Sequence, residues 1–589
     1  MNTKTYCAIF GPLTFETAAH VGVGRGNVGT DSPLRRNGRG ELALPGTALG
    51  GALRSLATRL ASRMELKGKR GVCLALMSGE ERKRQKKTEK EICGCAVCRL
   101  FGELYPGEER AEEKGGRASR LWVYDARLIS APRPFVRDGV GIDRVTGAAA
   151  RAGRIKFDTE VLPAGAIFEL RLELEDASHD DERLLAATLA EWQAGRTWLG
   201  GDAARGLGRA KLGEVQCVRN GLTTGDELLA FLRADDPRQV SKEDEGWLAR
   251  RVKEARIVSK LNGSTTGSFI EVEFALAIDG PFVTHDTTVA GAMGFDHVSL
   301  LDGVPGLDVE LRPIIPGSGL RGALRSHAER IARTLATVAA EDKKDEFLRT
   351  CPACNPVEDR LDAPLTKCDR LLTLPPEADV EETNLCLSCQ LFGSSRRGSR
   401  LRVMDAPLVG EPVWKAIDFL AIDRFTGGGL ESAKFDAAAL WRPTFAARLY
   451  LEEPQEWELG WLALVLRDLA EGRIAIGFGG AKGFGQATAK EIRIRCGFAG
   501  DAEWDGRATS HELKDRPGFY RMAEFTGADW AVHHEMVEDW VKAFHRELKK
   551  IDRAEGDLLP PPRKDSYFAK DTDSWNLARL YPVKEASRE

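Results

Sequence analysis

The sequence contains the same ordered set of motifs twice. The dodecamer LPGTALGGALRS at residues 44–55 returns as IPGSGLRGALRS at residues 315–326, and a strand-like segment ending in Gly-Pro precedes each copy. Four later blocks also recur: CAVCRLFGE (95–103) and CLSCQLFGS (386–394), RASRLWVYDARL (117–128) and RGSRLRVMDAPL (397–408), GIDRVTGAAARAGRIKFD (141–158) and AIDRFTGGGLESAKFD (421–436), and GGDAARGLGRAKL (200–212) and GGAKGFGQATA (479–489). Six blocks in one order indicate a tandem duplication, so the chain is expected to fold as two copies of one unit.

Each unit is predicted to mix strands and helices. FELRLELE (168–175) alternates apolar and polar residues, as a half-buried strand does. ERLLAATLAEWQAG (182–195) and WELGWLALVLRDLAEG (457–472) have apolar residues at helical spacing and end in glycine. We therefore expect the α+β class, with a first unit at 1–220, a helical or irregular linker at 221–265, a second unit at 266–498 and a C-terminal extension at 499–589.

The extension is expected to contain an amphipathic helix that packs on its own domain or on a neighbouring subunit. Seven of its side chains fall on one face at helical spacing. They are Trp530, His533, Val537, Trp540, Val541, Phe544 and Leu548.

Length and composition narrow the class of protein. A chain of 589 residues is too long for one hydrophobic core, and 42% hydrophobic with 30% charged residues is typical of a globular protein. No apolar run approaches the roughly 18 residues that a membrane span needs. The N-terminal segment MNTKTYCAIFGPLTF has no secretion signal, so we expect a cytoplasmic protein. The net charge of −4 does not decide whether nucleic acid binds, because binding depends on the field over one groove.

Most of the twelve cysteines gather in one insertion of each unit, which favours two structural zinc sites over disulfides. Four thiolates around zinc leave no position for water, so these sites are expected to stabilise the fold. In the second unit Cys368 is a fifth candidate that can replace one of the four chosen ligands. The predicted ligands are Cys73, Cys93, Cys95 and Cys98 in the first unit, and Cys351, Cys354, Cys386 and Cys389 in the second.

The dodecamers predict helix starts. Pro-Gly ends the preceding segment, Thr47 or Ser318 can act as N-cap, and the amides of a helix N-terminus favour phosphate. Arg54 and Arg325, two turns further on, are within reach of such a phosphate. The alternative is a tight contact between helix and sheet, for which glycine and alanine are equally suitable.

Taken together, the repeated motifs resemble the RAMP superfamily, most closely the backbone subunits of type III CRISPR effector complexes (the Csm and Cmr families). The resemblance covers residues 10–215 and 275–490, and two fused units resemble type III-D complexes in particular. It implies a ferredoxin-like, RNA-recognition-motif-like core in each unit, with a β-hairpin "thumb" beginning at Ile142 or Ile422. It also implies partners: a guide crRNA, a complementary single-stranded target RNA, other backbone subunits and a large signature subunit.

Residues expected to contact the guide backbone follow from the dodecamers, the thumbs and the Gly-x-Gly turns. Such contacts carry no sequence information, because base pairing between guide and target supplies the specificity. Asp143 and Asp423 are expected to orient the neighbouring thumb arginines. The predicted RNA-binding residues are Arg35, Arg36, Gly46, Thr47, Arg54, Arg144, Gly206, Gly208, Gly317, Ser318, Arg321, Arg325, Arg424, Gly483 and Gly485.

The resemblance places a catalytic aspartate in the loop before each dodecamer. Asp31 in GTDSPL and Asp296 in GFDH match that loop, with Asp286 and Asp302 as alternatives in the second unit. A carboxylate on a Gly-rich loop can hold hydrated Mg²⁺, or another divalent cation, or orient the 2′-hydroxyl beside the scissile phosphate. Arg35 and Arg36 are expected to stabilise the charge that develops there.

Three functions follow for such a chain. The first is a guide-directed, metal-dependent endoribonuclease that cuts target RNA at regularly spaced sites. The second is a non-catalytic scaffold of the same architecture. The third is an endoribonuclease that processes CRISPR repeats with histidine; His20 is its best candidate, and His285 lies in a different local context.

Overall fold

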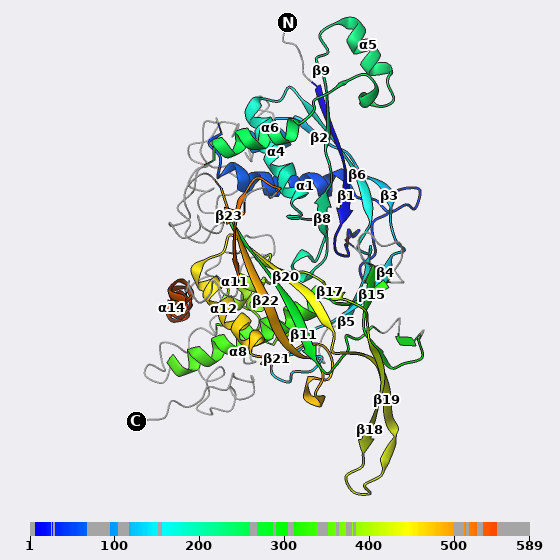
Figure 1. Cartoon of the computed structure of the whole chain (residues 1–589), viewed down its shortest axis with the longest axis vertical. Helices are drawn as coiled ribbons and strands as arrows, with labels where there is room; N and C mark the ends of the chain where they lie inside the picture. The colour runs from blue at the N-terminus through cyan, green and yellow to red at the C-terminus, as the bar shows by residue number, and fades with distance from the viewer. Residues whose placement is uncertain are drawn as a thin grey trace.

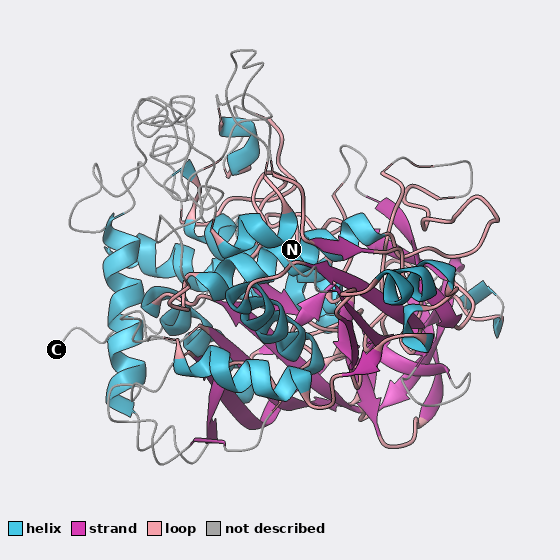
Figure 2. Ribbon diagram, turned by 90° about the horizontal axis from the view of Figure 1, so that it is seen from above, coloured by secondary structure: helices cyan, strands magenta, loops and turns pink. Residues whose placement is uncertain are grey.

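The computed structural model describes residues 6–24, 26, 30–66, 95–103, 117–150, 156–259, 268–286, 290–291, 293–303, 311–339, 352–360, 365–372, 380, 384–499, 512–513, 517–526 and 534–550. In Figure 2 the long helices lie to one side of the molecule and most strands to the other. Two large sheets, one from each half of the chain, carry the fold. The α+β class and the tandem arrangement are therefore confirmed.

The first sheet is centred on β1 (Tyr6–Phe15), which pairs antiparallel with β6 (Ile167–Glu175). The alternation of FELRLELE directs Phe168, Leu170 and Leu172 into the core, where all three are buried. The sheet order is β10-β9-β1-β6-β2, with β3 beside β6, β8 beside β1 and β7 beside β8. These strands are β2 (Leu121–Val123), β3 (Arg127–Ser130), β7 (Thr197–Trp198), β8 (Arg209–Leu212), β9 (Gln216–Asn220) and β10 (Lys242–Glu243).

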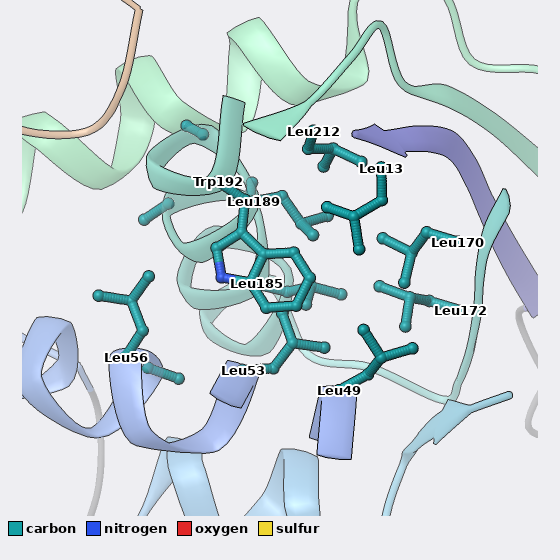
Figure 3. Packing of buried hydrophobic residues seen from close by; sticks show 14 of the residues in the cluster. Leu13, Leu49, Leu53, Leu56, Leu170, Leu172, Leu185, Leu189, Trp192 and Leu212 are labelled. Carbon is teal, nitrogen blue, oxygen red and sulfur yellow. The ribbon is translucent and has the colours of Figure 1, made fainter. Parts of the chain in front are cut away.

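Two helices cover this sheet. The repeated dodecamer forms the start of α1 (Gly46–Ala61), and α4 (His179–Gln193) begins at a capping box between Ser178 and Asp181. Figure 3 shows Trp192 of α4 enclosed by leucines from both helices and the sheet. The remaining helical elements of this half are α3 (Ala96–Phe101), η2 (Ala203–Arg205), α5 (Gly225–Arg233), η3 (Pro237–Gln239) and α6 (Trp247–Ile257).

The second sheet repeats the arrangement around β11 (Phe269–Asp279), which lies between β20 (Thr444–Glu452) and β22 (Gln486–Phe498). Its order is β14-β15-β17-β20-β11-β22-β24-β23, with β16 beside β20 and β21 beside β22. Its other strands are β14 (Leu301–Gly303), β15 (Leu311–Ile315), β16 (Leu401–Val403), β17 (Ala406–Val409), β21 (Ile474–Ala475), β23 (Glu512–Leu513) and β24 (Arg521–Thr526). Two short strands, β12 (Pro281–Phe282) and β13 (His297–Val298), pair instead with β19 (Gly429–Trp441) in a separate sheet. The helical elements are α8 (Gly317–Ala339), α10 (Cys368–Leu371), α11 (Leu387–Phe392), α12 (Glu456–Ala470), η5 (Gly480–Lys482) and α14 (His534–Lys550).

Segments outside the two repeats also pack into the cores. Trp247 of α6 is buried and donates from its indole Nε1 to Glu182 at 3.2 Å. On α14, Trp540 and Phe544 are buried, and the Phe544 ring stacks on Trp461 of α12. No helix among the described residues is long and apolar enough to cross a membrane.

Each half carries a β-hairpin of the kind predicted for the thumb, but each hairpin begins earlier than predicted, at Phe135 and Trp414 rather than at Ile142 and Ile422. The first thumb pairs β4 (Phe135–Val140) with β5 (Lys156–Val161), and the second pairs β18 (Trp414–Ile422) with β19 (Gly429–Trp441). Figure 1 shows the second thumb projecting from the body, whereas β4 and β5 lie beside strands of the second half.

Candidate active sites and metal centre

The predicted catalytic residue Asp31 is held by the first thumb. Its N–H donates to Asp158 Oδ1 at 2.6 Å, and the N–H of Asp158 donates back to Asp31 Oδ2 at 3.2 Å. The Thr30 hydroxyl donates to the same Asp158 Oδ1 at 2.7 Å. These donors, Thr30 first, hold the pKa of Asp158 below its usual range. The Asp31 side chain is thereby fixed while it stays exposed to solvent.

The second thumb holds Asp296 in the same way. The N–H of Asp296 donates to Asp436 Oδ1 at 2.8 Å, and the N–H of Asp436 donates to Asp296 Oδ2 at 2.9 Å. The shared pair of hydrogen bonds places Asp31 and Asp296 at equivalent positions of the two units. Of the two alternatives in the second unit, both Asp286 and Asp302 are buried, whereas Asp296 is exposed.

Sequence analysis missed Asp158 and Asp436 as partners of these aspartates. The signal was present, since each ends the recurring Lys-Phe-Asp of the thumb block. What the sequence lacked was any indication that this strand lies beside the aspartate loop.

The surroundings of the two aspartates differ. Ser32 follows Asp31, whereas His297 follows Asp296 and its Nδ1 lies 3.0 Å from the Nδ1 of His285. The His297 ring also stacks on Phe478, with centroids 4.6 Å apart.

Of the two arginines after Asp31, one is already paired. Arg36 forms an ion pair with Glu160 at 3.1 Å, whereas Arg35 is exposed and has no side-chain partner among the described residues. The backbone carbonyl oxygen of Glu160 also lies 2.8 Å from the ring Nδ1 of His20, within hydrogen-bonding distance. Arg35 is therefore the arginine of this pair that stays available to a phosphate.

At each helix that starts in a dodecamer, a carboxylate already accepts a hydrogen bond from the first N–H of the helix. Asp125 Oδ1 accepts from the N–H of Gly46 at 2.7 Å, and Asp405 Oδ1 accepts from the N–H of Gly317 at 2.7 Å. The amides predicted to bind phosphate at Gly46 and Gly317 are therefore already satisfied, and the carboxylates repel a phosphate there. Pro45, not Thr47, is the N-cap of α1.

Thr47 and Ser318 are therefore residues of the first helical turn rather than caps. Both are exposed, so their hydroxyls remain accessible.

The arginines further along these helices have different surroundings. Arg54 is half-buried, with no side-chain partner among the described residues. Arg321 donates to the Phe392 carbonyl, and burial, with Arg325 next to it, lowers its pKa to about 9. Arg325 itself is buried and pairs with Glu329 at 2.7 Å, so its guanidinium is engaged inside the protein, which speaks against the predicted RNA contact.

The Gly-x-Gly turns adopt left-handed backbone, which suits glycine. A Cβ at Gly208 would lie 2.1 Å from the Leu199 carbonyl oxygen, and one at Gly485 would lie 1.9 Å from that of Ile476. These two glycines thus permit close packing of the turn. Gly206 contacts Gly317 of the second unit, whereas a Cβ at Gly483 would meet nothing within 4 Å.

Four cysteines of the second unit form a compact buried cluster: Cys354, Cys368, Cys386 and Cys389, with all four Sγ atoms within 4.8 Å of one another. Zinc bound by four sulfurs at about 2.3 Å needs such a spacing, and a buried set of four thiols fits a structural site. Cys368 stands where Cys351 was predicted, and Cys351 lies outside the described residues.

In the first unit, Cys73 and Cys93 lie outside the described residues. Of the two remaining predicted ligands, Cys95 accepts from the N–H of Cys98 at 3.4 Å, at the start of α3.

Comparison with known proteins identifies the family. The RAMP superfamily matches residues 12–211 and 301–488, well over half of the chain and both copies of the repeat. The chain belongs to the RAMP superfamily. It is also similar to the CRISPR system Cms endoribonuclease Csm3 of Methanocaldococcus jannaschii, at 24% identity over 218 residues, which is 35% of this chain and 79% of that protein.

The thumbs of the two RAMP units have the same tip. Asp143 Oδ1 accepts from the N–H groups of Val145 and Thr146, and Asp423 Oδ1 accepts from those of Phe425 and Thr426. Both aspartates therefore build the turn, rather than orient the following arginine as predicted.

The thumb arginines differ in environment. Arg144 lies against the second RAMP unit, where its Nε donates to Glu329 Oε2 at 2.7 Å and both side chains are buried. Arg424 is exposed, with no partner among the described residues. Arg424 therefore keeps its predicted RNA contact as a prediction. The enclosure of the Arg144 guanidinium in the contact between the units speaks against an RNA contact for that residue.

Proposed function

We propose that this RAMP protein is a backbone subunit of a type III CRISPR ribonucleoprotein that binds a guide crRNA and cuts complementary target RNA. The observation that carries the proposal is the pair of equivalent aspartates, Asp31 and Asp296, each clamped to a thumb strand by two hydrogen bonds. The similarity to a protein named as an endoribonuclease supports the reaction class.

In this proposal the clamp orients the aspartate. The N–H of Asp158 donates to Oδ2 of Asp31, and the N–H of Asp436 donates to Oδ2 of Asp296. The other carboxylate oxygen of each aspartate, Oδ1, accepts no hydrogen bond in the part of the chain that the structure describes. That oxygen can accept a hydrogen bond from the 2′-hydroxyl next to the scissile phosphate or from a water on Mg²⁺. Positioning of this kind contributes about 10²–10⁴ in rate.

A divalent cation fits the exposed carboxylates of this site, because Mg²⁺ is held by one or two carboxylates and keeps most of its waters. When bound, the cation would stabilise the negative charge that develops on the phosphate. Arg35 adds a positive charge beside Asp31, and Lys482 adds one in the second unit, where it lies 4.6 Å from the centre of the Phe435 ring.

The other assignments belong to the same proposal. Zinc would bind Cys354, Cys368, Cys386 and Cys389, and a second zinc the insertion with Cys73, Cys93, Cys95 and Cys98. Arg35, Arg54 and Arg424 would contact RNA. The partners would be the guide, the target, other backbone subunits and a large signature subunit in the cytoplasm, and the unit boundaries would be those given above.

Purification of the chain from its native host tests the proposal. We expect a ribonucleoprotein with discrete guide RNAs, which cuts a complementary target into regularly spaced fragments only when Mg²⁺ is present. A target of scrambled sequence is the control and should stay intact. Absence of guide RNA would contradict the CRISPR assignment. If the complex bound its target but did not cut it at any Mg²⁺ concentration, the protein would be the non-catalytic scaffold instead.

A further inference from the structure

The contact between the two RAMP units is built on charged side chains of the first thumb. Arg137 of β4 is buried against the second unit, where it pairs with Asp302 and with Asp405. Asp405 acts through both oxygens: Oδ1 accepts from the N–H of Gly317 at 2.7 Å, and Oδ2 lies 2.8 Å from Arg137 Nη1. The same carboxylate therefore caps a helix and receives a guanidinium.

The first unit carries the equivalent carboxylate without a guanidinium. Asp125 Oδ1 accepts from the N–H of Gly46 at 2.7 Å, as Asp405 does for Gly317. Asp125 is exposed, and its Oδ2 has no partner among the described residues. In the second unit that oxygen receives Arg137.

The exposure of the residues beside these two aspartates supports the same conclusion. Met404, next to Asp405, is only 2% exposed and belongs to the hydrophobic core of the first unit. The residue of the first unit that matches Met404 is Tyr124, which is 38% exposed, and Trp122, which matches Arg402, is 53% exposed. The surface that the first unit covers on the second is therefore uncovered on the first.

A second copy of this chain does not carry the matching guanidinium. In the first thumb Arg137 lies opposite Thr159, one residue after the clamping Asp158. In the second thumb Ile417 lies opposite Ala437, one residue after Asp436, so Ile417 holds the position of Arg137.

The acceptor for the other thumb arginine is also missing from the first unit. Alignment of the dodecamers puts Thr58 at the position of Glu329, and the Thr58 hydroxyl already donates to the Arg54 carbonyl at 2.6 Å. Arg424 of another copy would therefore find no carboxylate there, and the ion pairs that Arg137 and Arg144 make with the second unit have no counterpart between two copies.

We propose that the face around Asp125, Trp122 and Tyr124 docks a different protein chain, which presents an arginine on a β-hairpin as Arg137 is presented to Asp405. A guanidinium suits the site because it can form directed hydrogen bonds to a carboxylate already fixed by a helix cap. RNA is the competing occupant, and the Asp125 charge disfavours its phosphates. The proposal goes beyond the function above, because it rests on the contact inside the chain and requires no cleavage.

The first test uses the purified full chain in sedimentation velocity over a hundredfold range of concentration. We expect the wild type to stay monomeric over this range, which sets a lower limit on its dissociation constant. Ile417→Arg should self-associate with a dissociation constant at least about tenfold below that limit, since a charge-assisted hydrogen bond to a carboxylate is worth that much. Adding Asp125→Asn to Ile417→Arg should cancel the gain, and thermal melting should show all variants folded. Two results would overturn the proposal. One is self-association of the wild type that Asp125→Asn abolishes, and the other is no increase in self-association with Ile417→Arg.

The second test uses the assembly purified from the native host. Asp125→Asn keeps the oxygen that caps α1, and we expect it to reduce one co-purifying protein about tenfold while guide RNA is retained. Asp226→Asn, at an exposed site on α5, is the matched control and should change nothing. Loss of RNA with every protein retained, or no change with Asp125→Asn, would overturn the proposal.

Discussion

The two thumbs have the same turn at their tips but different surroundings. Each turn is built by an aspartate that accepts from two following N–H groups, and each is followed by an arginine. In the first thumb that arginine is buried against Glu329, and in the second it is exposed beside a fully exposed Phe425. The comparison teaches that local sequence sets the turn, while the surface in front of it decides whether the tip is buried.

Removal of the proposed zinc from the second unit is expected to have the largest effect on the difference between the two thumbs. Glu329, which receives Arg144, also pairs with Arg325, and Arg325 Nη2 lies 3.7 Å from Cys389 Sγ. We expect removal of the proposed zinc to loosen the first thumb and not the second, because structural zinc contributes about 10–16 kcal/mol in small zinc-binding domains. Hydrogen exchange with and without a chelator should show faster exchange at 135–140 and no change at 414–422.

Cysteine variants separate the two candidate ligand sets. Cys368→Ser should lower the zinc content by one atom per chain, whereas Cys351→Ser, the matched control, should leave it unchanged. Equal zinc content in Cys368→Ser and wild type would show that the four-sulfur cluster does not bind the metal.

A smaller effect is expected from the thumb arginines themselves. Arg144→Ala leaves the buried Glu329 with one partner fewer, and breaking such a buried pair costs about 3–5 kcal/mol. Arg424→Ala, at the equivalent exposed position, should change the free energy of unfolding by less than about 0.5 kcal/mol. Denaturant unfolding of both variants measures the difference, and equal values would contradict the distinction between the thumbs.

The smallest effect concerns a buried histidine that only the second unit has. His327 of α8 lies 2.8 Å from Asp468, whereas the aligned residue of α1 is Leu56. Burial lowers the pKa of His327 despite that carboxylate, so the neutral imidazole is favoured in the folded state. The unfolded chain then binds the proton first as the pH falls below 6.5, so stability should decrease over this range.

His327→Leu should remove this part of the pH dependence, because the folded chain then carries no histidine at that position. Thermal melting of wild type and variant between pH 7 and pH 5 provides the measurement. Parallel profiles for the two proteins would contradict the assignment.

Much of the fold could be predicted because its signals are local. The alternation in FELRLELE and the helical spacing around Trp192 depend on neighbouring residues alone, and the recurrence of the dodecamer is visible in the sequence itself. The sites were predicted less well, because they depend on which side chains meet across the chain. Glu329 follows Arg325 by four residues on one helix, so their ion pair is readable from local spacing. Nothing near Arg325 in the sequence indicates that a cysteine cluster lies beside it, and nothing near Gly317 indicates that Asp405 accepts from its N–H.

Cleavage mapping tests most directly the central claim, that the two RAMP units carry equivalent active aspartates. The measurement is the fragment ladder from an end-labelled target cut with Mg²⁺ by complexes containing wild type, Asp31→Ala or Asp296→Ala. We predict that Asp31→Ala abolishes one cut, that Asp296→Ala abolishes a different one, and that both variants bind target as wild type does. A full ladder from both variants would contradict the claim.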